Sequence, residues 1–181
     1  MIVFFGQPGV GKSTQGKMLA TKQVWHWISA GQLLRESGDP EIHEMLSRGV
    51  LVPYETICKF IGDELAKRAD SKHVIIDGFA RNVRQARWLI EDGKKYNRVV
   101  ELVFVIGISK DKLIERLVAR GREDDTETAI KKRLEIYNQE TYPVLDYFKN
   151  EGVRIAYIDG LGTPEEVHAR IMEVIKECKL D

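Results

Sequence analysis

Apolar residues gather in five short runs along the chain, and the stretches between them repeat apolar residues at helical spacing. The runs cover residues 1–5, 25–28, 73–76, 99–106 and 153–158. Continuous apolar runs of this length are typical of strands buried on both faces. Because the runs alternate with helical stretches, the sheet that they form is expected to be parallel. We therefore predict an α/β fold: a three-layer sandwich with a five-stranded parallel sheet and helices on both faces.

Two of the connecting helices are indicated by their apolar faces. The first opens at Pro53, and its apolar face comprises Ile57, Phe60, Ile61 and Leu65. The second starts near Asp124 or Asp125, and its apolar face comprises Ile130, Leu134, Tyr137 and Leu145. Residues spaced by three and four positions lie on one face of a helix, which can then pack on the sheet. Pro143 lacks a backbone N–H and is expected to kink or end a segment of the second helix.

The last helix carries a start signal of its own. Thr163 stands at the N-cap, Pro164 at the first helical position and Glu166 at the third, and together they form a capping box. Residues 29–60 make a long excursion between the second and third strands, and insertions of this kind often carry binding residues. We predict that the whole chain, residues 1–181, is a single domain.

A glycine-rich segment follows the first apolar run and opens a helix. Residues 6–13 read Gly-Gln-Pro-Gly-Val-Gly-Lys-Ser and complete the phosphate-loop pattern G-x-x-x-x-G-K-[ST]. The glycines let several backbone N–H groups converge on one anion, and the helix N-terminus adds partial positive charge. Lys12 adds a full positive charge, and the hydroxyl of Ser13 suits Mg²⁺ or a phosphate oxygen. A structural glycine-rich turn rarely has Lys and Ser at these offsets, so the sequence predicts a P-loop NTPase fold that binds a nucleoside triphosphate.

A second polar motif ends the third predicted strand. Asp77 follows the run Val74–Ile76, and Arg81 stands four residues later. A carboxylate at this end of a strand can hold Mg²⁺ or its waters beside the phosphate loop. An arginine there can bond a phosphate through two parallel N–H groups. Asp-Gly after a strand is also a common turn signal, and the phosphate loop is what favours the functional interpretation.

Charge and cysteine content narrow the class of protein. The 28 basic and 28 acidic side chains give a formal net charge of zero, so no general attraction to nucleic acid or to anionic membranes is expected. The two cysteines, Cys58 and Cys178, lie far apart in the chain, which argues against a structural zinc site and for a reducing compartment. No apolar stretch reaches the ~18 residues of a membrane span, and no signal peptide is expected before the first strand. We expect a cytoplasmic enzyme without structural zinc that binds neither nucleic acid nor membranes; nothing in the sequence indicates an oligomeric state.

Five segments stand in order along the chain: Gly6–Gln15, Ser29–Arg35, Gly49–Pro53, Asp77–Gln85, and Arg116–Asp125 with Arg133. They resemble segments of the adenylate kinases within the nucleoside monophosphate kinase family, which are, in the same order, the phosphate loop, S-T-G-D-x-L-R, G-x-L-V-P, D-G-F-P-R-x-x-x-Q and the arginine set around the lid. The resemblance runs from Met1 to about Ile175. It implies a phosphotransferase of nucleotide biosynthesis that moves the γ-phosphoryl group of ATP–Mg²⁺ to AMP, reversibly giving two ADP.

The resemblance also implies roles for individual side chains. The catalytic residues would be Lys12, Arg81, Arg120, Arg122 and Arg133, which neutralise charge during phosphoryl transfer. The ATP site would comprise Gly9, Val10, Gly11, Lys12, Ser13, Thr14, Arg116, Arg120 and Gly162, with Arg116 stacked on the donor adenine. The AMP site would comprise Ala30, Arg35, Val50, Val52, Gly78, Arg81, Gln85, Arg122 and Arg133. Mg²⁺ would be held by Ser13 and Asp77, directly or through water.

Spacing gives an independent check on one of these arginines. Arg133 lies three residues after Ile130 and four before Tyr137, so it borders the apolar face of its helix. For each arginine the alternative is a solvated surface charge. For Asp124 and Asp125 the alternative is that one of them caps the following helix.

The resemblance determines the identity of the acceptor base less closely than it determines the reaction. Gln85 stands four residues after Arg81, where adenylate kinases use Gln to bond the adenine edge and UMP/CMP kinases carry Asn. Ala30 in place of Thr, and Asn82 after Arg81, resemble the pyrimidine enzymes instead. We expect AMP as the acceptor. A UMP/CMP kinase of the same fold and a non-catalytic nucleotide-binding protein are the alternatives.

Within the single domain, the resemblance divides the chain into three parts. A core covers residues 1–28, 61–115 and 124–181, an NMP-binding segment covers residues 29–60, and a residual lid covers residues 116–123. Gly121 alone separates Arg120 from Arg122, where relatives insert from a handful to some tens of residues. We therefore expect the lid arginines to be preorganised on the ends of two fixed helices. The exclusion of water would then fall to residues 29–60 or to a neighbouring subunit. Ala80, before Arg81, replaces the family's Pro.

Overall fold

Five strands form one sheet in the order β2-β3-β1-β4-β5 in the structure, a computed structural model that describes residues 1–180. The strands are β1 Ile2–Phe5, β2 His26–Ser29, β3 Val74–Asp77, β4 Leu102–Gly107 and β5 Arg154–Asp159. Every neighbouring pair in this order is parallel. The predicted five-stranded parallel sheet is confirmed. Because the order reverses around β1, the point where ligands bind in such sheets lies at the carboxyl end of β1.

The fourth strand begins later than predicted. The apolar run starts at Val99, but the strand starts at Leu102. Leu102 pairs with Ile2 of β1 and with Arg154 of β5, the first residue of each neighbour. Residues 99–101 therefore precede both neighbouring strands, and the side chain of Val99 is exposed. An apolar pattern does not report where a partner strand begins.

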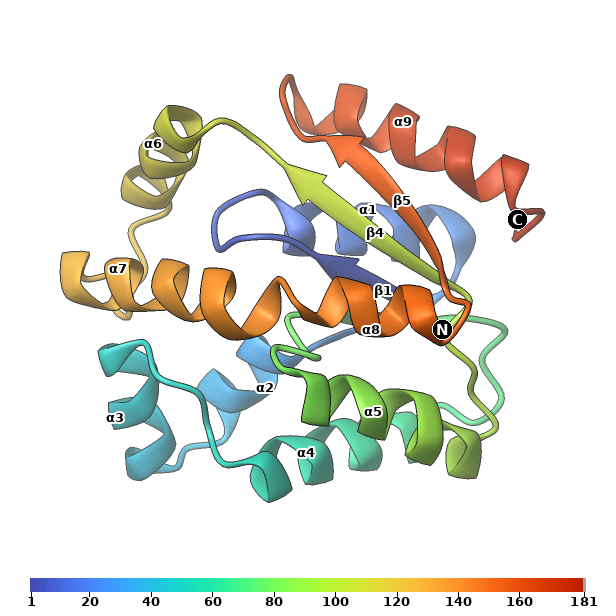
Figure 1. The fold of residues 1–181 in the computed structure, drawn as a ribbon, viewed down its shortest axis with the longest axis horizontal. Helices are drawn as coiled ribbons and strands as arrows, with labels where there is room; N and C mark the ends of the chain where they lie inside the picture. Colours follow the sequence, from blue (N-terminus) through green and yellow to red (C-terminus); the bar gives the residue numbers. More distant parts are fainter. Residues whose placement is uncertain (181) are drawn as a thin grey trace.

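Helices cover both faces of the sheet, as predicted (Figure 1). They are α1 Lys12–Gln23, α2 Ala30–Glu36, α3 Pro40–Arg48, α4 Tyr54–Ala66, α5 Val83–Glu91, α6 Lys110–Arg120, α7 Glu127–Ile136, α8 Val144–Asn150 and α9 Pro164–Glu177. Successive β1 side chains point to opposite faces, so Val3 and Phe5 lie in a core with α4, α5 and α8. Ile2 and Phe4 lie in a second core with α1, α6 and α9.

The helix starts at Pro53 and Thr163 are confirmed. Pro53 is the N-cap of α4, and Ile57, Ile61 and Leu65 are buried on its inner face. Thr163 Oγ1 accepts a hydrogen bond from the Glu166 N–H at 3.2 Å, and Glu166 Oε2 accepts one from the Thr163 N–H at 2.8 Å. Among residues 1–180, no helix has both the length and the apolar character that a membrane crossing requires.

α7 starts at Glu127, two to three residues after Asp125 and Asp124, near which its start was predicted. Thr126 is the N-cap, and its side chain accepts a hydrogen bond from the Ala129 N–H at 3.2 Å. Neither aspartate caps the helix, because both carboxylates are bonded to arginines. The interruption at Pro143 is confirmed: a π-helical turn, Tyr137–Thr141, separates α7 from α8. Across this turn the predicted apolar face divides, since Ile130 and Leu134 pack on one core and Tyr137 and Leu145 on the other.

Val24 ends α1 in a conformation that suits glycine better. Its φ is +56° and its side chain is 90% exposed, so no packing offsets the unfavourable backbone. We expect Val24→Gly to raise the free energy of unfolding by about 0.5–1 kcal/mol, since a β-branched residue is disfavoured at this left-handed position. Denaturant unfolding would measure the change, with Val24→Ala as the control that keeps a Cβ. An unfolding midpoint for Val24→Gly at or below that of the parent chain would contradict the expectation.

Candidate active site

A cleft of about 520 Å³ opens at the carboxyl ends of the strands, at the point where the strand order reverses. Most of the predicted site residues line it: Gly9, Val10, Gly11, Lys12, Ser13, Thr14, Arg35, Val50, Asp77, Gly78, Arg81, Arg116, Arg120, Arg122, Arg133 and Gly162. Ala30, Val52 and Gln85 are not among the lining residues, and their side chains are buried. Ala30 and Val52 lie in the core with α4 and α5.

The phosphate loop contacts β4 so closely that a side chain does not fit at its first position, which therefore requires glycine. Gly6 has a φ of +137°, and a Cβ added there would lie 2.4 Å from the carbonyl oxygen of Ile106. The loop curls around the end of Lys12, whose Nζ donates hydrogen bonds to the carbonyl oxygens of Gly6 at 2.8 Å and Gln7 at 2.9 Å. The loop thus forms a closed ring around its own lysine.

Lys12 is buried among more positive than negative side chains. Its pKa is lowered to about 8, chiefly by burial; the charge of Asp77 opposes this, and the charges of Arg81, Arg120 and Arg122 add to it. Burial also lowers the pKa of Arg81, and the charge of Arg133 adds to this effect. A phosphate placed among these groups would supply the missing negative charge. The electrostatics therefore favour a polyanionic ligand.

Ser13 and Asp77 meet across the cleft floor, as the sequence predicted for a magnesium site. Ser13 Oγ donates to Asp77 Oδ2 at 2.6 Å, and Asp77 is buried at the end of β3. Hydroxyl and carboxylate oxygens are the hard ligands that Mg²⁺ prefers, and Mg²⁺ commonly takes one or two protein groups besides water and phosphate. Among residues 1–180, no three His, Cys, Asp or Glu side chains gather into a metal-binding group. The donor set fits a cation that arrives with a nucleotide.

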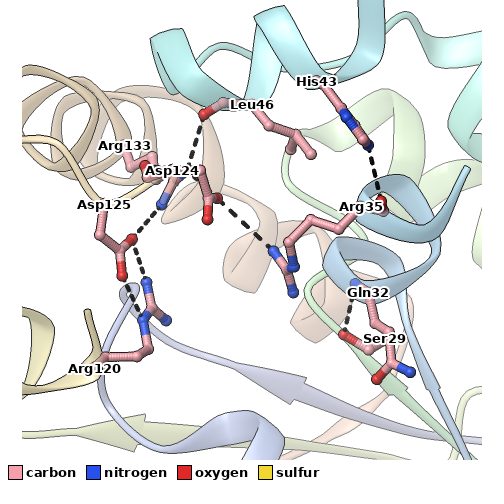
Figure 2. Close-up of polar contacts among 9 residues, drawn as sticks. All are labelled: Ser29, Gln32, Arg35, His43, Leu46, Arg120, Asp124, Asp125 and Arg133. Carbon is pink, nitrogen blue, oxygen red and sulfur yellow. Dashed lines mark hydrogen bonds and ion pairs between the residues drawn. The ribbon is translucent and has the colours of Figure 1, made fainter. Parts of the chain in front are cut away.

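Asp125 holds two of the predicted catalytic arginines (Figure 2). Its side chain is only 2% exposed and accepts from Arg120 Nε at 2.7 Å, Arg120 Nη2 at 2.6 Å and Arg133 Nη1 at 2.8 Å. Burial alone would raise the pKa of Asp125, but the hydrogen bonds and charges of Arg120 and Arg133 outweigh it and lower that pKa. The alternative of solvated surface charges therefore does not hold for these two arginines.

Asp124 links the same cluster to the segment 29–60. Its carboxylate accepts from Arg133 Nη2 at 2.6 Å and lies 3.8 Å from Arg35 Nη1 on α2. Arg133 Nη2 also donates to the carbonyl oxygen of Leu46 on α3 at 3.0 Å, which Figure 2 shows. A Cβ on Gly49 would lie 2.6 Å from the carbonyl oxygen of Ala129 on α7. Within residues 29–60, α3 and Gly49 thus lie directly against α7.

The remaining lid arginines sit at the end of α6. Arg116 Nη1 donates to the Val10 carbonyl at 3.3 Å and Nη2 to the Gly160 carbonyl at 3.0 Å, so the side chain bridges the phosphate loop and the end of β5. Arg122 lines the cleft, and burial, followed by the charge of Arg120, lowers its pKa. The segment 116–123 consists of the last turn of α6 and three loop residues, and α7 follows shortly after. Within residues 1–180 there is no separate lid.

Arg81 is held through its backbone by two side chains. Its N–H donates to Gln85 Oε1 at 2.9 Å, and its carbonyl accepts from Thr141 Oγ1 at 2.7 Å. Arg81 Nε donates to the Gly78 carbonyl at 2.8 Å. The sequence pattern predicts that Gln85 bonds the acceptor base and gives Thr141 no role. The only signal for Thr141 was its place two residues before Pro143, where an irregular helical turn is expected.

Comparison with known proteins identifies similar chains. The sequence model of the family described as adenylate kinase matches residues 4–153. An adenylate kinase of Prochlorococcus marinus (strain MIT 9301) is 38% identical over 164 residues, which cover 87% of this chain and 88% of the relative. One of Thermus thermophilus is 38% identical over 184 residues, 94% of each chain. One of Mycolicibacterium paratuberculosis is 36% identical over 177 residues, 94% of this chain and 96% of the relative.

Proposed function

Since this chain belongs to the adenylate kinase family, we propose that it transfers the γ-phosphoryl group of ATP to AMP and reversibly forms two ADP. The observation that carries the proposal is the convergence of a phosphate loop and an arginine cluster on one cleft. Lys12 lines this cleft together with five arginines: Arg35, Arg81, Arg120, Arg122 and Arg133. Two polyanions brought together for phosphoryl transfer need fixed cations of this kind.

We assign the donor phosphates to the loop. Bound phosphate oxygens would take the place of the Gly6 and Gln7 carbonyls as partners of Lys12 Nζ, and the loop N–H groups would bond the same anion. Ser13 and Asp77 would hold Mg²⁺, which when bound neutralises charge on the nucleotide phosphates. Arg116 extends from the loop toward Gly160 and would border the donor adenine.

We assign the acceptor phosphate to Arg35 and Arg81, and the group in transfer to Arg120, Arg122 and Arg133. The support is their position on the cleft wall. Asp125 fixes Arg120 and Arg133 before any ligand binds, so little reorganisation would accompany the reaction. Charges preorganised around a transition state lower its energy more than mobile charges do.

We further propose that the chain works as one domain without a moving lid. Residues 29–60 would bind the acceptor and close the cleft against α7, where Leu46 and Gly49 already lie. The segment 116–123 would serve only to fix the positions of Arg116, Arg120 and Arg122. Spin-label distances with and without a bisubstrate analogue test this arrangement. A displacement of residues 119–124 as large as that of residues 40–50 would contradict it.

The acceptor test is a coupled assay of AMP, CMP, UMP and GMP with ATP–Mg²⁺. We expect AMP to have the highest kcat/KM, because the Gln85 amide offers a donor and an acceptor suited to the adenine edge. In the structure its oxygen is taken by the Arg81 N–H, so we expect discrimination against CMP and UMP of only about 10- to 100-fold, far below that of a fully hydrogen-bonded reader. A higher kcat/KM for CMP or UMP than for AMP would support a pyrimidine kinase. No transfer to any of the four would support a non-catalytic nucleotide-binding protein.

A further inference from the structure

The connection from β3 to Arg81 contains a left-handed backbone conformation at Ala80, which a residue with a Cβ does not favour. Ala80 has a φ of +59°, and its side chain is completely buried. Gly78, two residues earlier, has a φ of +73°. A left-handed conformation is uncommon for a residue with a Cβ and persists only where the surroundings hold it. Something outside this short connection must therefore maintain the path from β3 to Arg81.

The holding groups are two buried side chains that bond the peptide groups of Arg81. Gln85 Oε1, on the first turn of α5, accepts from the Arg81 N–H at 2.9 Å. Thr141 Oγ1 donates to the Arg81 carbonyl at 2.7 Å. Both side chains are buried, where water does not compete for these bonds. Gln85 is local to the connection, whereas Thr141 is 60 residues away and ties the connection to another element.

Thr141 reaches Arg81 because the helix widens there. The Tyr142 N–H donates to the Tyr137 carbonyl at 2.7 Å, five residues back, and Tyr137–Thr141 is a π-helical turn. Figure 1 shows α7 and α8 end to end on either side of this break, above α5. Such turns are rare and occur frequently at functional sites. Ile136, Tyr137 and Thr141 all line the cleft, so the turn forms part of its wall.

The side chain of Arg81 is left available to a ligand by this arrangement. Its Nε is bonded to the Gly78 carbonyl at 2.8 Å. The part of the chain that the structure describes offers no hydrogen-bond acceptor to its Nη1 or Nη2. The backbone contacts therefore fix where the guanidinium stands, and its two outer nitrogens face the cleft unpaired.

We propose that Thr141 is a positioning residue for phosphoryl transfer. Through the π-helical turn, Thr141 fixes the position of Arg81 relative to Arg133. Arg133 lies on α7 and Thr141 follows on the same helical path. One continuous element thus sets Arg133 directly and Arg81 through a hydrogen bond to its carbonyl. This inference rests on the proposed function, since it takes Arg81 and Arg133 as the groups around the transferred phosphate.

The test compares Thr141→Val, which keeps the shape and loses the hydroxyl, with Thr141→Ser, which keeps the hydroxyl. We expect Thr141→Val to lower kcat by roughly 10- to 100-fold, because a shift of about 1 Å in a catalytic group can have that effect. The KM for AMP should rise several-fold, and the KM for ATP should stay within about twofold, because Thr141 bonds Arg81 whereas Lys12 bonds the loop carbonyls. Thr141→Ser should restore kcat to within about threefold of the parent chain.

A control separates positioning from general destabilisation. Ile61→Val removes one methyl group from the core in which Val144 and Leu145 also lie, and it should lower the melting temperature without changing kcat at 25 °C. Equal kcat losses in Thr141→Val and Ile61→Val, or no rescue by Ser, would overturn the inference. A parent chain that transfers no phosphoryl group to AMP would instead refute the proposed function. An active parent with a fully active Thr141→Val variant would refute the positioning role alone.

Discussion

Replacing Lys12 with Met is expected to reduce the turnover of ATP and AMP by at least about 10²- to 10³-fold, the loss typical when one preorganised charge is removed from a transition state. Its Nζ lies inside the phosphate loop and bonds only the Gly6 and Gln7 carbonyls. Within residues 1–180, no other side chain bonds the Gly6 or Gln7 carbonyl, and Arg116 bonds the loop at the Val10 carbonyl instead. The lost charge therefore has no substitute within the described site.

The fold should survive this change. The pKa of Lys12 is lowered to about 8 by burial and by neighbouring arginines, so the folded state disfavours its charged form. Removing that charge is expected to leave the free energy of unfolding unchanged or slightly higher. A coupled assay at saturating ATP–Mg²⁺ and AMP, with thermal unfolding in parallel, checks both parts. More than about a tenth of the parent turnover in a folded Lys12→Met variant would contradict the assignment.

Replacing Asp125 with Asn is expected to damage both stability and activity. The carboxylate receives three hydrogen bonds from Arg120 and Arg133 and is 2% exposed. Asparagine keeps the shape but removes the charge, which leaves Arg120 without its counter-ion and Arg133 with Asp124 alone. Breaking a buried ion pair in this way typically costs about 3–5 kcal/mol, and we expect about 3 kcal/mol here because Arg120 is partly exposed.

The loss in activity should exceed what unfolding explains. With Arg120 released and Arg133 held only by Asp124 and the Leu46 carbonyl, kcat is expected to fall roughly 100-fold even at a temperature where the variant is fully folded. Denaturant unfolding and a coupled assay measure the two effects. Asp146→Asn is the matched control, since Asp146 is a 78% exposed aspartate on α8 whose ion pair with Lys149 spans 3.7 Å. If Asp125→Asn and Asp146→Asn unfold at the same denaturant concentration, the structural role of Asp125 is wrong.

Local sequence patterns determined the parts of this protein that depend on neighbours in the chain. The apolar runs placed all five strands, and the residue types of the capping box placed the start of α9. The phosphate-loop pattern predicted a strand, a turn and a helix, and the structure has β1, the loop and α1 in that order. These signals are reliable because strand pleating, helix capping and glycine turns are decided by residues only a few positions apart.

The tertiary structure alone decided how the aspartates are used. A carboxylate just before a helix suits an N-cap as well as an ion pair, so the sequence left both interpretations of Asp124 and Asp125 open. Arginines from α2, α6 and α7 converge on these carboxylates, and Thr126 takes the cap. The carboxylates bond these arginines and not the end of α7, and only the packing of three helices brings the arginines together.

The orientation of Gln85 and the role of Thr141 were likewise outside the reach of the sequence. Spacing placed Gln85 near Arg81, but whether its amide bonds a ligand or a peptide group depends on the path of the backbone through Ala80. The contact between Thr141 and Arg81 joins residues 60 positions apart. A pattern along the chain encodes which backbone each segment prefers, whereas hydrogen bonds between distant segments exist only after the sheet and its helices have packed.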